Sequence, residues 1–212
     1  MIYSVPFSAD LANILASELL AHYQSNPLEL AKVQLILPTK RACLAVKNAF
    51  LKQNKTTLLP QIMPLYELNI LHDEIPEAIS DTERLLLLAR LCFAKSNIQT
   101  YDQAIKMAIS LTELLNTAYQ FELDLSRLSE VVQIEQFAAH WQETVQFLDI
   151  LYTHWPKILK ERHQVDPMDR TVRLIRQFTQ DLKKEPDKIV YMAGFLNVFP
   201  AINELIDLAS AR

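Results

Sequence analysis

Runs of apolar residues that end at prolines or turn residues predict the strands of this chain. These runs are IYSV (2–5), VQLILPT (33–39), LLPQIMPLYEL (58–68) and KIVYMAGF (188–195). Between the first three runs, apolar residues recur with helical spacing, as in KRACLAVKNAFLKQ (40–53). Strands that are separated by helices pair in parallel, so the pattern predicts an α/β fold with a parallel sheet.

The middle of the chain has helical periodicity without strand runs. A capping box formed by Ser80 and Glu83 opens the first of these helices, which is apolar nearly all round. Helical spacing continues over 101–121 and over 134–163, the longest pattern in the chain. A further helix is predicted to start at Asp166, because a proline follows it at the first helical position.

This helical block lies between two predicted strands of the same sheet, so we interpret it as an inserted all-helical subdomain. The expected division is an α/β core of residues 1–75 and 187–212, with the helical insertion at 76–186. The chain stops directly after a strand and a helix, without further strands to complete the sheet. We therefore expect it to be the N-terminal fragment of a longer protein.

Composition narrows the setting and the class of function. The chain has 212 residues and a net charge of -4, which gives no overall attraction to nucleic acids or acidic membranes, so DNA binding would need a local basic patch. The cysteines Cys43 and Cys92 lie in apolar helical patterns without metal-ligand spacing, as expected of reduced, buried thiols. Neither a signal peptide nor an apolar run long enough to span a membrane is present, so we expect a cytoplasmic protein.

The chain contains a single glycine, Gly194, and this excludes two common nucleotide sites. A Walker A loop needs at least two glycines and a dinucleotide fingerprint needs three, because backbone N–H groups must curl around phosphate without Cβ clashes. The histidines and acids form no metal-binding or catalytic constellation that the sequence reveals. No cofactor, metal or catalytic residue is therefore predicted, and a small-molecule enzyme is disfavoured.

The stretch LPTKRA has the pattern of a phosphate-binding site. A predicted strand ends at Pro38, and Thr39, Lys40 and Arg41 follow at the start of a helix. A hydroxyl, unpaired backbone N–H groups and two cations are then close together, which suits the phosphates of a nucleic-acid backbone. The alternative interpretation is an ordinary capped and solvated helix start.

A second group of cations lies on the helix that starts after Asp166. Arg170 and Arg173, with Arg176 at the next position of the same spacing, share one helical face. This face is either a phosphate-binding stripe or a solvated surface whose arginines pair with Asp166 and Asp169.

Several of these stretches, taken in order, resemble one known family. VQLILPTKRACLAVKNAFL followed by LLPQIMPL resembles the opening of the AddB subunit of alphaproteobacterial-type AddAB helicase–nucleases. HWQETVQFLDILYTHWPKIL and VDPMDRTVRLI are similar to the helical region of that family, and IVYMAGFLNVFPAINELIDLA is similar to its next junction. The likeness extends in order over nearly the whole chain.

The resemblance implies a P-loop-NTPase-like sheet of the superfamily-one helicase type, in a subunit that processes DNA double-strand break ends for recombination. It implies an AddA-type partner that carries the working ATPase, and it implies that Thr39, Lys40 and Arg41 contact the backbone of single-stranded or forked DNA. Arg170 and Arg173 are weaker candidates for the same role.

The chain departs from active helicases at both ATP-binding elements. The loop SVPFSADLA (4–12) has neither glycine nor lysine, and Ala193 occupies the place of an acid that other AddB-like proteins carry before the glycine. Without a phosphate cradle and an acid to position Mg²⁺, ATP-driven translocation by this region is not expected. The alternative function is an α/β module that binds only another protein and makes no contact with DNA.

Overall fold

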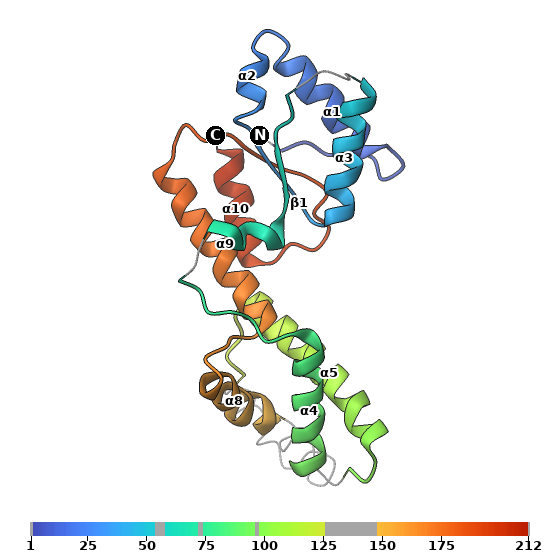
Figure 1. Ribbon diagram of the computed structural model, residues 1–212, viewed down its shortest axis with the longest axis vertical. Coiled ribbons are helices and arrows are strands. Elements are labelled where there is room, and N and C mark those ends of the chain that lie inside the picture. Colours follow the sequence, from blue (N-terminus) through green and yellow to red (C-terminus); the bar gives the residue numbers. More distant parts are fainter. Residues whose placement is uncertain (1, 54–57, 72–73, 96–97, 126–147, 212) are drawn as a thin grey trace. The chain divides into compact units, whose positions relative to one another are not determined.

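The computed structural model describes residues 2–53, 58–71, 74–95, 98–125 and 148–211, which group into two compact units (Figure 1). The α/β unit consists of Met1–Asp73 and Leu174–Arg212, and the helical unit consists of Glu74–Arg173. The boundaries expected from the sequence lay at residues 75/76 and 186/187. The first boundary differs by two residues, and the second falls within one helix, α9 (Pro167–Lys184), whose residues from Leu174 onward belong to the α/β unit.

The α/β unit contains a three-stranded parallel sheet, which confirms the predicted α/β class with a parallel sheet. Strand β1 (Gln34–Leu37) lies between β2 (Gln61–Pro64) and β3 (Val190–Met192). Leu37 is opposite Pro64 in the register of β1 and β2. Every residue of β1 is buried, as expected for the central strand, whereas β2 is an edge strand that tolerates its proline.

The prediction of a strand at 2–5 was wrong. Residues 2–6 adopt no strand conformation, and the side chains of Ile2 and Tyr3 are 72% and 78% exposed. A strand forms only when a neighbour satisfies its backbone N–H and C=O groups. The sequence of a four-residue run that ends before Pro6 does not show whether another strand lies next to it.

Helices cover both faces of this sheet (Figure 1). Helices α1 (Leu11–His22) and α3 (Lys40–Gln53) lie on one face together with the short α2 (Pro27–Leu30), and Asp10 caps α1 by accepting from the N–H of Asn13. The other face is covered by α10 (Pro200–Ser210) and by the part of α9 that belongs to this unit. The core between α1, α3 and β1 includes Leu19, Leu35, Leu37, Val46 and Phe50.

The helical unit is built on a hairpin of α4 (Asp81–Lys95) and α5 (Tyr101–Phe121). Ser80 accepts a hydrogen bond from the N–H of Glu83 through its hydroxyl, which is one half of the predicted capping box, while the Glu83 carboxylate pairs with Arg162. Of the helical pattern predicted for 134–163, residues 134–147 lie outside the described residues. The rest contains a π-helix, η4 (Ile150–His154), and α8 (Trp155–Glu161), with Pro156 in the first turn of α8. Helices α4, α5, η4 and α8 pack around one hydrophobic core, which includes Leu88, Leu111, Leu115, Ile150 and Trp155.

A buried polar network holds the start of α9 in the helical unit. The Asp166 carboxylate caps α9 by accepting from the N–H of Met168, at 3.0 Å, and it also accepts from the indole N–H of Trp155, at 3.1 Å. Nε of Arg84 lies 3.0 Å from Oδ2 of Asp166, as an ion pair rather than an aligned hydrogen bond. Arg84 also donates to Oδ1 of Asn116, at 2.8 Å.

None of the helices in the described ranges combines the length and the apolar character that a membrane crossing requires.

Candidate nucleic-acid interface

The predicted site at Thr39, Lys40 and Arg41 lies where β1 ends and α3 begins. Thr39 caps α3, because its hydroxyl oxygen accepts from the N–H of Ala42 at 3.1 Å and its carbonyl accepts from the N–H of Cys43 at 3.1 Å. Among the described residues, no group accepts from the backbone N–H of Lys40 or Arg41. The first turn of α3 therefore has donors for an external acceptor, as helix starts commonly do.

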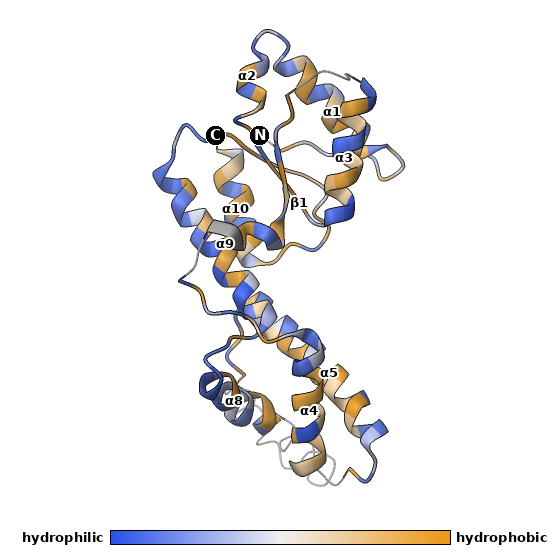
Figure 2. Ribbon diagram, in the orientation of Figure 1, coloured by the Kyte–Doolittle hydropathy of each residue, from blue (hydrophilic) through white to orange (hydrophobic). Residues whose placement is uncertain are grey.

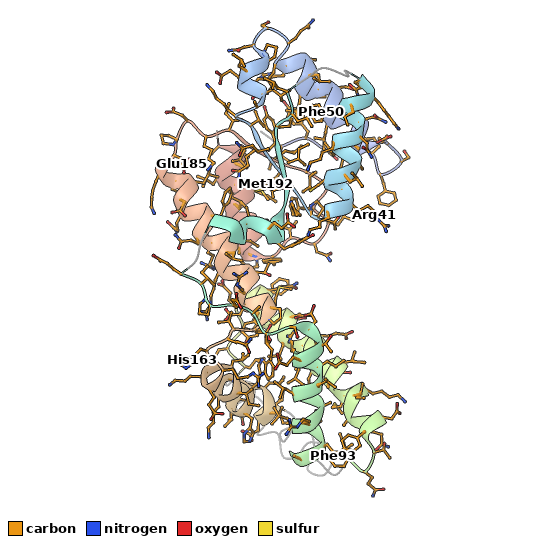
Figure 3. The ribbon with its side chains drawn as sticks, in the orientation of Figure 1. Arg41, Phe50, Phe93, His163, Glu185 and Met192 are labelled. Carbon is orange, nitrogen blue, oxygen red and sulfur yellow. The ribbon has the colours of Figure 1, made fainter. Side chains whose placement is uncertain are left out.

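The three predicted side chains are exposed together on this turn, which is hydrophilic in Figure 2. Arg41 is labelled at the start of α3 in Figure 3. Lys40 has a side chain that is 70% exposed, and its Nζ lies 2.6 Å from Oε1 of Glu67. The hydrogen bond to Glu67, and then the charge of that carboxylate, raise the pKa of Lys40. Lys40 is thus a charged and accessible cation at neutral pH.

Two residues of the neighbouring strand end were missed in the sequence. The 3₁₀ helix η1 (Leu65–Leu71) follows β2 directly, and it brings Tyr66 and Glu67 to Lys40. The Nζ of Lys40 lies 5.8 Å from the centre of the Tyr66 ring, within the range of a cation–π contact. Their position follows from the parallel register, which the sequence alone does not specify: Leu37 pairs with Pro64, so Thr39 and Tyr66 are each two residues beyond a matched pair.

Beside this turn, the carboxyl ends of β1 and β3 border an apolar depression of about 240 Å³. In open parallel sheets, ligands commonly bind at the carboxyl ends of the strands, between two neighbouring strands whose following connections run to opposite faces of the sheet. The depression is lined by one glycine and by aliphatic side chains that carry neither charge nor hydroxyl. The lining residues are Leu11, Ala12, Leu15, Leu37, Pro38, Ala42, Ala45, Val46, Ala193 and Gly194. Such a lining offers nothing that recognises a triphosphate or holds Mg²⁺.

Gly194 closes this depression in a conformation that favours glycine. Its φ of +78° lies in the left-handed region, and a Cβ at this position would stand 3.3 Å from Cδ2 of Leu11 and 3.7 Å from Cδ of Pro38. The single glycine of the chain is therefore explained by its positive φ and by close packing against Leu11 and Pro38.

Arg170 and Arg173 are placed in the helical unit, so the structure does not unite them with the turn at Thr39 within one compact unit. Nε of Arg170 donates to the carbonyl oxygen of Pro76 at 3.0 Å. Arg173 binds both carboxylate oxygens of Asp169, at 2.9 and 2.7 Å. This is the pairing with Asp169 that the alternative interpretation requires, while Asp166 contacts Arg84 instead.

The histidine and acidic side chains give no candidate metal centre within the described ranges, where no group of three His, Cys, Asp or Glu side chains is suitably close. Both cysteines are buried free thiols, as the sequence predicted.

No protein-family model matches this chain, and no curated protein does either.

Proposed function

We propose that the chain is a helicase-like, ATP-independent scaffold that binds the sugar–phosphate backbone of single-stranded or forked DNA at Thr39, Lys40 and Arg41. In this proposal it is the N-terminal region of an AddB-type subunit, acting with an AddA-type partner in the processing of double-strand break ends. The observation that carries the DNA-binding part is the exposed first turn of α3, with two cations, a hydroxyl and two backbone N–H groups that have no acceptor among the described residues.

The chemistry of this turn suits a phosphate diester. The hydroxyl of Thr39 uses its oxygen to accept from Ala42, and its own proton stays available for a phosphate oxygen. Arg41 supplies a planar group of N–H donors, and Lys40 supplies a point charge. Contacts of this kind are made to the backbone, so they predict binding that is indifferent to sequence and sensitive to salt.

The ion pair of Lys40 with Glu67 does not oppose this assignment. Both side chains reach solvent, and exposed ion pairs contribute little to stability because water and salt screen them. A phosphate that approaches Lys40 therefore competes with a weak partner.

The apolar depression supports a scaffold rather than a motor. The resemblance implies that the loop at 4–12 and Ala193 stand where a motor holds the phosphates and Mg²⁺, and the depression that Leu11, Ala12 and Ala193 help to line carries only aliphatic side chains and no carboxylate. ATP hydrolysis by phosphoryl transfer needs donors around the phosphates and a bound metal ion. The proposed role is consequently to guide or separate strands while the partner supplies the ATPase.

The test compares two double variants of the same helix. Lys40→Ala with Arg41→Ala removes the cations of the first turn, whereas Lys47→Ala with Lys52→Ala removes two exposed lysines further along α3. Binding of an oligothymidylate of about 15 nucleotides is measured by fluorescence anisotropy at low salt. We expect the first variant to lose about ten-fold or more in affinity and the second to change by less than about three-fold. Equal losses, or none, would contradict the assignment.

A second candidate, a module that binds only protein, is favoured by one feature of the helical unit. A groove of about 400 Å³ is lined mostly by apolar residues of α4 and α5, of which Leu86, Tyr101 and Ile105 are exposed, and it is bordered by the charged side chains of Glu83, Arg90 and Arg162. Exposed apolar surface of this kind is typical of protein-binding sites. An unmodified chain that binds no oligothymidylate at low salt would favour this candidate over the first.

A further inference from the structure

We infer that Tyr66 is a stacking platform for an unpaired base of the strand whose phosphates lie at the start of α3. The inference rests on the proposed function and specifies its ligand as single-stranded nucleic acid with at least one unstacked base at this point. It concerns a side chain outside the predicted set of Thr39, Lys40 and Arg41.

The Tyr66 ring is presented to solvent by a short element whose other side is anchored. Tyr66 is 44% exposed, whereas Leu65 and Leu68 of the same 3₁₀ helix are 8% and 0% exposed. The two buried leucines fix the backbone on both sides of the tyrosine, so the ring projects from a rigid base. A rigid aromatic ring loses little conformational entropy when a flat partner stacks on it.

The position of the ring relative to Lys40 matches the two parts of a nucleotide. The Nζ of Lys40 lies 5.8 Å from the ring centre. Tyr66 comes two residues after the last residue of β2, just as Thr39 comes two residues after the last residue of β1. The cation thus lies over one face of the aromatic ring at the ends of two paired strands, so a base would stack on the opposite face. The cation is suited to the phosphate of a nucleotide, and the ring is suited to the flat face of its base.

This arrangement discriminates between single strands and duplexes. In a duplex each base already stacks on its neighbours, so an exposed ring gains no base face without unstacking them. In a single strand the base face is available at small cost, and every base has one, so the contact is sequence-tolerant. The inference therefore predicts a preference for single strands that the cations alone do not produce.

The experiment measures the affinity of Tyr66→Ala, Tyr66→Leu and Tyr66→Phe chains for three probes. The probes are an oligothymidylate of about 15 nucleotides, an abasic strand of equal length and a blunt duplex. We expect Tyr66→Ala and Tyr66→Leu to lose about 5- to 150-fold on the oligothymidylate, the range measured for base–aromatic stacking, and Tyr66→Phe to stay within about two-fold. On the abasic strand and the duplex, all four chains should bind alike.

A fluorescent adenine analogue placed within the strand gives an independent readout. Stacking on the ring should quench its emission in the unmodified and Tyr66→Phe chains but not in Tyr66→Ala. A folding defect would weaken binding to all three probes, whereas loss of stacking affects only the probe that has bases.

The outcomes separate this inference from the proposal beneath it. If the Lys40/Arg41 double variant loses affinity while Tyr66→Ala binds the oligothymidylate normally, the stacking inference is overturned and the proposed function remains. If Tyr66→Ala weakens the oligothymidylate and the abasic strand equally, the ring acts through Lys40 alone and stacking is also overturned. If the unmodified chain binds none of the probes, both fail.

Discussion

Replacing Arg84 by methionine tests the buried network that fixes the start of α9. Arg84 and Asp166 have side chains that are 2% and 0% exposed, and Nε of Arg84 lies 3.0 Å from Oδ2 of Asp166. Methionine fills much of the volume of the arginine stem without its charge. The substitution leaves the Asp166 carboxylate with only two neutral donors, and it leaves Oδ1 of the Asn116 side chain without its 2.8 Å donor.

The expected loss is large because a buried charge is left without its partner. Breaking a buried ion pair by removing one member costs about 3–5 kcal/mol in the free energy of unfolding. Adding Asp166→Asn to Arg84→Met removes the unpaired charge and keeps an oxygen to cap α9. The double variant should therefore be more stable than Arg84→Met alone, a non-additive result that identifies the two residues as coupled.

The pH dependence has a defined sign. Burial raises the pKa of Asp166, and the charge of Arg84 opposes that rise, so removing Arg84 raises the pKa further. A carboxyl whose pKa is higher in the folded than in the unfolded state binds more protons when folded. Its contribution to stability is full below its unfolded pKa and is lost as the pH rises through its folded pKa. Arg84→Met should therefore be less destabilising near about pH 5 than near about pH 7.

Urea unfolding followed by circular dichroism measures these differences, and in a Trp141→Phe background the fluorescence of Trp155, which donates to Asp166, reports locally. Arg90→Met in the same helix is the matched control, because Arg90 is exposed and should change stability by no more than about 0.5 kcal/mol. A loss below about 1 kcal/mol for Arg84→Met at neutral pH, or greater destabilisation in acid, would refute the reasoning.

Three further predictions concern the α/β unit and the thiols. Gly194→Ala should lower the free energy of unfolding by about 1–2 kcal/mol, because alanine at φ +78° is strained and its Cβ meets Leu11; an unchanged urea midpoint would contradict this. Glu67→Gln should strengthen oligothymidylate binding about two- to five-fold by releasing Lys40, and weaker binding would show that Glu67 orients the lysine instead of competing with phosphate. Burial raises the pKa of Cys92 to about 11, so a thiol reagent at mildly alkaline pH should label it much more slowly in the folded chain than in urea, whereas equal rates would contradict its burial.

The sheet was largely predictable because its strands are short apolar runs with clear boundaries. The apolar run at 33–39 predicted β1, and the turn predicted at Gly194 lies two residues beyond the end of β3. The strand prediction at 2–5 was wrong because a short, mainly apolar run is equally compatible with an extended segment that pairs with no other strand. The pattern of apolar and polar residues predicts which residues are buried, but it does not predict which strands pair with each other.

The candidate site was predictable only as far as local geometry determines it. Thr39 was recognisable as a helix cap from its place after a proline-ended strand, and the structure shows that cap. The contacts of Lys40 with Tyr66 and Glu67 depend on the register between two strands, which composition does not specify. In the same way, Asp166 was recognisable as the start of a helix, whereas its pairing with Arg84 arises from packing between distant segments.

The salt dependence of oligothymidylate binding tests most directly whether the start of α3 holds a nucleic-acid backbone. Each phosphate contact on a single strand contributes about 0.7 to the slope of log affinity against log salt concentration. We predict that replacing Lys40 and Arg41 by alanine reduces the magnitude of that slope by about 1.4, while replacing Lys47 and Lys52 leaves it unchanged. An identical slope for the Lys40/Arg41 variant and the unmodified chain would contradict the central claim.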